Sequence, residues 1–418
     1  MSKFVKLSSI ATLTVGFVGT MAKHYTESGV PLLRSLNIKP FKIVGNDMKY
    51  VSAEFSNSIS KSILHKGDVI IVRTGIPGTC CVVPAEYDGC NCSDVVIVHP
   101  NTSLVDPHYL AAFINVWGQR QVQNNKVGAI QQHFNVHSAE EMLIFLPDLD
   151  EQKRIAAVIV ALNSKIDNNN SICSELESMA KTIYDYWFTQ FDFPNADGHP
   201  YRSAGGAMEW NELYKREIPK GWIVAPLSQF LNCNKHTVRK KDQLESISYL
   251  DTGSLTDNAI DTVEYYESIS VAPVRAQRIV YQNDILYSTV RPIQRHYGII
   301  KHPAKNMVAS SGFACLSCKS DPKYNDLFYL FITAIHNTKK LCAIADSSVS
   351  AYPSINPSDI LDLQIALPKD LDEIDELVST LSSLLSAKAH WQDEIKQLSC
   401  LRDWLLPMLM NGQATVAE

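Results

Sequence analysis

Two stretches of the chain place hydrogen-bond donors directly after a run of apolar, strand-forming residues. The runs are VIIV at 69–72 and ILYS at 285–288, and each is followed by a segment that contains Gly or Pro. Such a pattern predicts a strand that ends in a loop. The donors are Arg73, Thr74 and Thr79 in the first loop, and Arg291, Gln294 and Arg295 in the second. Arginine suits a guanine edge or a phosphate and glutamine an adenine edge, so these loops are candidates for reading nucleic acid.

A second polar loop follows later in each half of the chain. The further candidates are Lys126, Gln131, Gln132 and Asn135 in the first half, and Ser347, Ser348 and Tyr352 in the second. The structural alternative is that Arg73 and Arg291 only cap strands or pair with acids. Both halves place an arginine close after the same strand, which favours the functional interpretation.

Motifs for catalysis are absent or poorly formed. The chain has no G-x-x-x-x-G-K-[ST] loop for a nucleoside triphosphate. It also lacks the Asn/Asp-Pro-Pro-aromatic stretch with which amino-methyltransferases grip a base; INPSD at 355–359 is the nearest approach. Asp148 followed by Glu151-Gln152-Lys153 has the residue types of a nuclease site, but its carboxylates fall at a predicted helix start, where they stabilise the helix. We expect no catalytic residue in this chain.

Metal binding is not predicted either. Cys315 and Cys318 lie three apart in a predicted strand, so they point to opposite faces, and no second pair completes four ligands. Cys90 and Cys92 have no partner pair, and QQHFNVHS, which holds two histidines four apart, is predicted to be a loop.

The elements that carry the donors occur twice. With a constant offset of 216 residues, HKGDVIIVRTGIPG at 65–78 falls on YQNDILYSTVRPIQ at 281–294, so that Asp68 matches Asp284. LPDLDEQKRIAAVIV at 146–160 likewise has a second copy, LPKDLDEIDELVSTL at 367–381. In both halves a predicted strand (93–98 or 311–316) precedes a helical pattern (106–117 or 326–336). We therefore predict an α+β fold with two pseudo-repeated domains of mixed sheet and helix.

A long amphipathic helix is predicted after each domain. Its apolar stripe repeats at steps of three and four over about five heptads. The stripe comprises Ile155, Ile159, Leu162, Ile166, Asn169, Ile172, Leu176, Met179 and Ile183 in the first copy, and Leu377, Leu381, Leu384, Lys388, Trp391, Ile395, Leu398 and Leu405 in the second. Two narrow stripes favour an antiparallel intramolecular coiled coil over packing of each helix on its own domain. The polar members Asn169 and Lys388 either set the register of the two helices or lie at the solvent-exposed edge of the helix interface.

These elements give a domain plan. The boundaries are 1–148 for the first domain, 149–190 for the central helix, 191–222 for a connector, 223–368 for the second domain, 369–410 for the C-terminal helix and 411–418 for a tail. The connector is rich in Pro, Gly, Asn and Asp, which predicts irregular structure. Its aromatic residues Phe191, Phe193, Tyr201 and Trp210 predict that it packs against something.

Composition narrows the class of protein. The 418 residues are 45% hydrophobic and carry a formal net charge of −6, so no overall basic field attracts nucleic acid. Ten cysteines without paired spacings indicate reduced thiols and a cytoplasmic location. The N-terminal run IATLTVGFVGTMA is too short to span a bilayer, and its Leu-x-x-apolar spacing recurs at 225–233, which predicts a strand or turn and no membrane association.

The chain resembles the specificity (S) subunits of type I restriction-modification systems. The similarity lies in LPDLDEQKRIAAVIVALNSKIDNNNSICSELESMAKTIYDYWFTQFDFPNADGHPY, in the EIPKGW that follows and in the terminal LRDWLLPMLMNGQ; the second copy of the first motif lacks its Gln-Lys-Arg. The resemblance implies two target-recognition domains that each read half of a bipartite DNA sequence and are separated by two long helices. It also implies two modification (M) subunits that bring the methyltransferase chemistry, and restriction (R) subunits that join for cleavage.

The resulting hypothesis is a non-catalytic recognition subunit that binds double-stranded DNA and has no cofactor of its own, with S-adenosylmethionine expected on the M subunits. One alternative is a stand-alone coiled-coil scaffold or DNA-binding regulator. Another is a methyltransferase with an unfamiliar motif.

Overall fold

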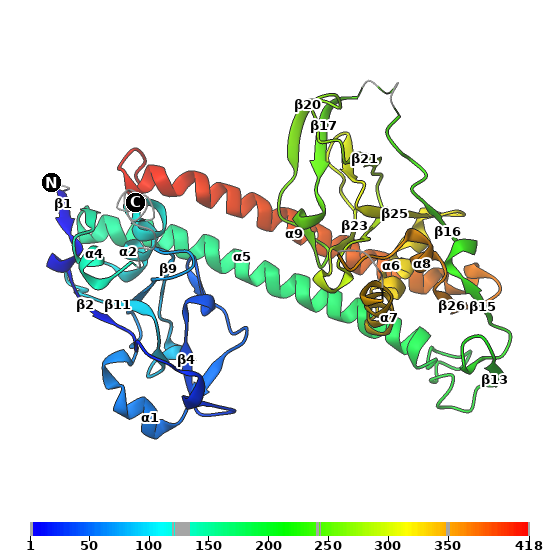
Figure 1. Ribbon diagram of the computed structural model, residues 1–418, viewed down its shortest axis with the longest axis horizontal. Helices are drawn as coiled ribbons and strands as arrows, with labels where there is room; N and C mark the ends of the chain where they lie inside the picture. The colour runs from blue at the N-terminus through cyan, green and yellow to red at the C-terminus, as the bar shows by residue number, and fades with distance from the viewer. Residues whose placement is uncertain are drawn as a thin grey trace. The chain divides into compact units, whose positions relative to one another are not determined.

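The computed structural model describes residues 3–118, 121, 134–239, 242, 244–347 and 352–416 (Figure 1). It consists of two units. The first contains Met1–Asn168 and Ile395–Glu418, and the second contains Asn169–Glu394. Part of each long helix, α5 (Leu149–Tyr184) and α9 (Asp375–Met410), belongs to each unit.

The first unit is built on two four-stranded sheets, with strand orders β2-β11-β8-β9 and β10-β4-β7-β3. Two short pairs, β1-β12 and β5-β6, complete its strands. The strands are β1 (Lys3–Lys6), β2 (Ala11–Val15), β3 (Tyr25–Thr26), β4 (Val30–Leu33), β5 (Ile38–Lys39), β6 (Lys42–Ile43), β7 (Lys49–Val51), β8 (Val69–Val72), β9 (Cys80–Val82), β10 (Asn91–Cys92), β11 (Val95–Pro100) and β12 (Leu143–Leu146). The shorter helices are α1 (Ala53–Ser58), α2 (Pro107–Phe113) and α4 (Val136–Glu140).

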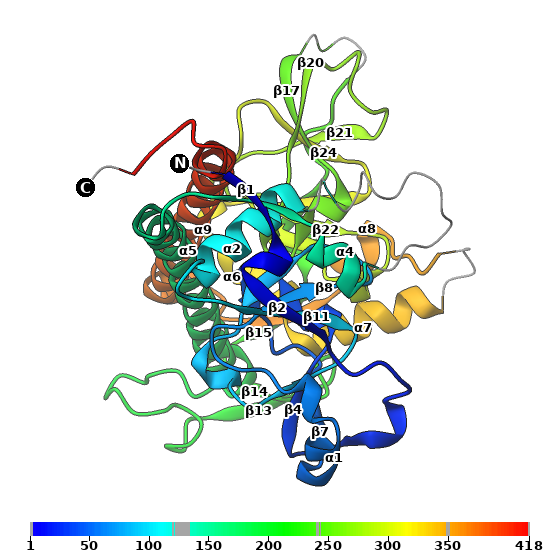
Figure 2. The same cartoon turned by 90° about the vertical axis from the view of Figure 1, so that its left-hand side faces the viewer.

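The second unit repeats this plan. Its four-stranded sheets have the orders β16-β25-β22-β23 and β20-β17-β24-β21, and β17 and β20 run side by side in both views (Figure 2). The strands are β13 (Met208–Asn211), β14 (Arg216–Pro219), β15 (Ile223–Pro226), β16 (Leu231–Cys233), β17 (Glu245–Leu250), β18 (Leu255–Thr256), β19 (Ala259–Ile260), β20 (Glu264–Ser268), β21 (Ala276–Ile279), β22 (Ile285–Ser288), β23 (Tyr297–Ile299), β24 (Met307–Ser310), β25 (Phe313–Cys318) and β26 (Gln364–Leu367). The helices are α6 (Asn325–Thr333), α7 (Ile335–Asp346) and α8 (Pro357–Leu361).

The duplicated α+β fold expected from the sequence is confirmed strand by strand. Strand β8 at 69–72 corresponds to β22 at 285–288 with the predicted offset of 216 residues. Each is flanked by the matching strands, β9 and β11 in the first unit and β23 and β25 in the second. The N-terminal apolar run includes β2, as the strand interpretation required.

Strand β8 is apolar along its whole length because both of its faces are covered. Val69 and Ile71 belong to the core that also contains α2, whereas Ile70 and Val72 belong to a separate core against the second sheet. Side chains alternate between the faces of a strand, so burial on both sides requires an uninterrupted apolar run. The loops that leave β8 and β22 therefore start from strands held on two sides.

The long helices pair as antiparallel helices within each unit. In the first unit the start of α5 and the end of α9 share one core, and Arg402 donates to the side-chain oxygen of Asn163 at 3.0 Å. In the second unit the end of α5 packs with the start of α9, and Lys388 lies 2.5 Å from Glu177. Asn169 is fully buried and Lys388 is 4% exposed, so neither lies at a wet edge. None of the described helices is both long and apolar enough to cross a membrane.

Two local expectations were wrong. The end of the segment predicted as the loop QQHFNVHS forms the start of helix α4, because Asn135 accepts a hydrogen bond from the Ser138 backbone and caps the helix; residues 131–133 lie outside the described residues. In the connector, Phe191 is fully buried and Phe193 stacks on Tyr201 at 4.7 Å, but Trp210 lies on a two-stranded hairpin, β13-β14, and is 58% exposed.

Candidate nucleic-acid interface

The loop after β8 is held by the carboxylate of Asp94, which lies between β10 and β11. Arg73 lies 3.3 Å from one carboxylate oxygen of Asp94, and the hydroxyl of Thr74 donates to the other at 2.8 Å. Arg73 also donates through Nε to the backbone oxygen of Phe134 at 3.1 Å, and its side chain is only 15% exposed. The guanidinium thus ties the β8 loop to the segment before α4 and is itself largely buried within the unit.

A cavity of about 760 Å³ opens beside this loop. Thr74 and Ile76 line it from the loop, and Tyr25, Arg34 and Lys39 line it from earlier in the chain. Arg34 pairs with the Asp47 carboxylate at 3.0 Å, and its guanidinium carbon lies 5.9 Å from the centre of the Tyr25 ring. A surface that combines cations, hydroxyls and apolar groups has the chemistry needed for phosphate and base contacts.

The loop after β22 presents its donors differently. Arg291 and Arg295 both adopt left-handed backbone conformations, with φ values of 48° and 58°, on either side of a single 3₁₀ turn. Left-handed backbone is strained for residues other than glycine and is found where the surroundings impose it. Here the Arg291 N–H donates to the Pro353 carbonyl at 2.8 Å, and the Asp257 N–H donates to the Arg295 carbonyl at 3.0 Å.

The two arginines of this loop have different surroundings. Arg291 is exposed, with its guanidinium carbon 5.1 Å from the centre of the Tyr352 ring. Arg295 instead pairs with Asp257 at 2.7 Å and donates to the Tyr297 hydroxyl at 3.1 Å. Gln294, between them, is exposed. Arg291, Gln294 and Tyr352 therefore form a surface group, while Arg295 anchors the loop.

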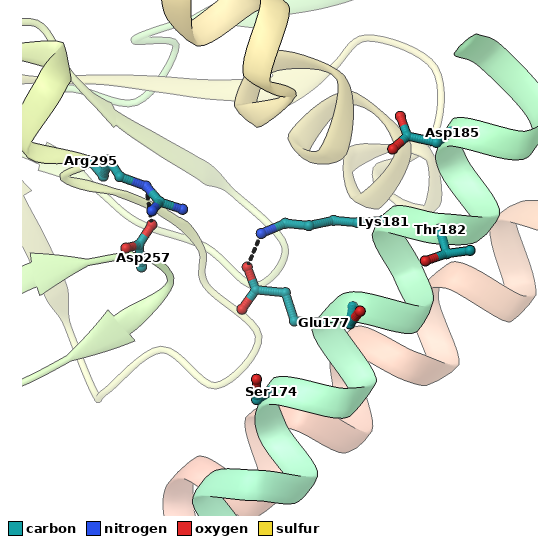
Figure 3. A pocket seen from close by; sticks show the side chains of 8 residues that line it. Ser174, Glu177, Lys181, Thr182, Asp185, Asp257 and Arg295 are labelled. Carbon is teal, nitrogen blue, oxygen red and sulfur yellow. Dashed lines mark hydrogen bonds and ion pairs between the residues drawn. The ribbon is translucent and has the colours of Figure 1, made fainter. Parts of the chain in front are cut away.

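Arg295 also lines a cavity of about 410 Å³ beside α5 in the second unit (Figure 3). Across this cavity lies Glu177 of α5, which pairs with Lys181 at 2.6 Å and with Lys388 of α9 at 2.5 Å. Burial alone would raise the pKa of Glu177, but the ammonium groups of Lys388 and Lys181 lower it below its usual value. The Arg295 end of the loop after β22 thus faces a cluster of paired charges on the long helices.

The other sequence-predicted residues differ in their surroundings, and Thr79 lines the same cavity as Thr74. Thr79 is 4% exposed, and the Asn135 side chain caps α4. Asn356 stands in the corresponding position before α8 in the second unit, where its backbone N–H donates to the Asp359 carboxylate at 2.6 Å. Ser347 is exposed at the end of α7 and donates to the Ile344 carbonyl at 2.8 Å. Lys126, Gln131, Gln132 and Ser348 lie outside the described residues.

Sequence reasoning missed Arg34, Lys39, Ile76 and Ile293. Arg34 follows an apolar strand run, as Arg73 does, and that signal was available. Ile76 and Ile293 stand in loops where apolar residues attract no attention as binding groups, and only their exposure identifies them.

Comparison with known proteins gives a consistent result. Residues 21–178 match the family model described as the type I restriction modification DNA specificity domain. The chain is 21% identical to the type I restriction enzyme HindI specificity subunit of Haemophilus influenzae, over 87% of this chain and 91% of that protein. It is also 21% identical to the putative type I restriction enzyme MjaX specificity subunit of Methanocaldococcus jannaschii, over 95% of this chain and 90% of the relative.

The fold agrees with that relationship. The crystal structure of a type I restriction-modification S subunit from M. genitalium superposes with a TM-score of 0.60 at 13% identity, covering 98% of this chain and 96% of the other. The family-model match covers residues 21–178, which lie mostly in the first unit, and the structural match extends over both units. In sequence the chain is similar to the DNA specificity subunits of type I restriction-modification systems.

Proposed function

We propose that each unit reads one half of a bipartite DNA target through the loop that follows β8 or β22. The observation that carries this proposal is that both units build a braced loop at the same strand end. In the first unit Arg73 binds the Phe134 carbonyl, and in the second the Ile355 N–H donates to the Thr289 carbonyl at 2.9 Å. Donors on braced loops lose little conformational entropy when they bind, which suits sequence readout.

We further propose that the chain acts without catalytic residues of its own, in a complex with two M subunits that carry S-adenosylmethionine, and with R subunits for cleavage. Support comes from apolar side chains that the long helices leave exposed. Val160 is 37% and Met179 51% exposed on α5, and Trp404 is 59% exposed on α9. The net charge of −6 also favours partners that share the phosphate contacts.

The experiment that tests the proposal is a methylation and binding assay with the full chain and its M subunits. The complex should methylate one bipartite sequence, and the chain alone should bind DNA weakly and transfer no methyl group. Specific, tight binding by the chain alone at physiological salt would contradict the dependence on partners. Methyl transfer by the chain alone would show that it is a methyltransferase, and failure to bind any M subunit would favour a scaffold.

The length of α5 and α9 is proposed to set the number of base pairs between the half-sites. Inserting one heptad into each helix keeps the apolar stripe in phase and adds about 10.5 Å at about 1.5 Å per residue. At about 3.4 Å per base pair, the preferred spacer should grow by about three base pairs. A site library with varied spacers measures this. An unchanged spacer with intact activity would exclude the helices as the measuring element, and changed half-site bases would exclude independent reading.

A further inference from the structure

An exposed isoleucine lies in the loop after the equivalent strand of each unit, although the offset of 216 residues places Ile76 on Pro292, one position before Ile293. Ile76 lies between β8 and β9 and is 67% exposed, and Ile293 lies between β22 and β23 and is 77% exposed. Each stands four residues before the first residue of the next strand, Cys80 or Tyr297. The loop sequences differ, RTGIPGT against TVRPIQR, so simple copying of a sequence does not account for the shared isoleucine.

Single exposed apolar residues are common on protein surfaces and need no explanation by themselves. These two differ because their loops are braced. The Ile293 turn is bounded by the left-handed Arg291 and Arg295, and Pro292 beside it is buried. In the first unit, the Gly78 N–H donates to the Val72 carbonyl at 3.1 Å and the Val72 N–H to the Thr79 carbonyl at 2.8 Å.

The neighbours of each isoleucine indicate what it would contact. Ile293 lies directly between Pro292 and the exposed Gln294, with exposed Arg291 at the start of the same turn. A glutamine amide pairs with the N6 and N7 groups of adenine, and an apolar side chain contacts the C5 methyl group of the thymine opposite. Ile76 shares the 760 Å³ cavity with Thr74 and Lys39, which places hydroxyl and cationic groups beside it.

We infer that Ile76 and Ile293 are specificity-determining residues, each of which contacts the C5 methyl group of a thymine in the half-site read by its own unit. The inference rests on the proposed function and adds the chemical group that is recognised. Without that methyl group the complex loses the burial of about one carbon, which corresponds to about a fourfold loss of affinity.

The test uses the full chain in complex with its M subunits, and target duplexes in which single thymines are replaced by deoxyuridine, which lacks only the methyl group. With the wild-type complex, one substitution in each half-site should weaken binding about fourfold. Ile293→Ala should bind the thymine and deoxyuridine duplexes equally in one half-site and keep the discrimination in the other. Ile76→Ala should lose the discrimination between thymine and deoxyuridine in the other half-site and keep it in the half-site that Ile293 contacts.

Val274→Ala is the matched control, because Val274 is 91% exposed in the second unit outside this loop, and it should leave both discriminations intact. The inference would be overturned if the wild-type complex bound every deoxyuridine duplex as tightly as the thymine duplex, or if one half-site contained no A·T pair. It would also be overturned if the alanine variants still discriminated thymine from deoxyuridine. Loss of M-subunit binding in an isoleucine variant would also overturn it and would assign the residue to a protein contact. Absence of any sequence-specific binding by the wild-type complex would instead be a failure of the proposed function.

Discussion

Replacing Arg291 gives the sharpest test of the second reading loop. Its guanidinium is exposed beside Tyr352, and its backbone is held at φ 48° by the hydrogen bond to Pro353. A guanidinium that grips a guanine edge contributes about 1–3 kcal/mol of discrimination, which corresponds to about 5- to 140-fold in affinity. Arg291→Ala should therefore weaken binding by that factor at one base pair of one half-site, with the other half-site unaffected.

Two further variants separate readout from structure. Arg291→Lys retains the positive charge but cannot form the bidentate hydrogen bonds of a guanidinium. Discrimination between guanine and the other bases should therefore fall nearly as far as with alanine. Arg291→Gly relieves the left-handed strain, which costs about 1–2 kcal/mol for other residues, so its fold should be at least as stable as that of the alanine variant.

The assay measures affinity of the M-subunit complex over a library of single-base target variants. Arg202→Ala is a suitable control, because Arg202 lies in the connector of the same unit and pairs with Glu217 at 3.5 Å. An equal loss of affinity for all sequences would make Arg291 a phosphate contact, and an unchanged affinity would refute any role for it in binding.

Three other predictions concern the framework. Lys388→Met should destabilise the second unit by up to about 3 kcal/mol because it leaves the largely buried Glu177 carboxylate with only Lys181 as a partner, whereas adding Glu177→Leu should restore most of that loss in a chemical unfolding experiment. Asp68 accepts a hydrogen bond from His99 and raises the pKa of that imidazole. The pair therefore adds fully to the free energy of unfolding below about pH 6.5, and this stabilisation is lost as the pH rises through the His99 pKa of the folded state. His99→Gln should remove this pH dependence from a plot of the free energy of unfolding against pH. Asn135→Ala should lower stability by about 1 kcal/mol through loss of the α4 cap and leave base preference unchanged, as a binding library can verify.

The parts of the fold that the sequence predicts well are those set by local periodicity. A short run of β-branched residues such as 69–72, followed by a segment that contains Gly and Pro, signals a strand buried on both faces. A heptad stripe signals a long helix, and α5 and α9 form where the stripes predict them, although Met179 of the predicted stripe is 51% exposed and Ala180 beside it is buried. The duplication was visible because the two copies keep a nearly constant spacing of chemically similar residues.

The sequence alone also determined which side chains stand at the ends of the reading strands, and with them the kind of chemistry available to each loop. Tertiary structure decided what those side chains do. Arg73 and Arg291 follow equivalent strands, yet Asp94 holds the first while the second remains exposed over Tyr352. A side chain's partners come from segments distant in the chain, and a polar group that is buried must satisfy its hydrogen bonds with whatever the packing brings near it. For that reason the local sequence identifies these side chains as possible donors. Only the tertiary structure shows which of them hold a loop in place and which are exposed on its surface.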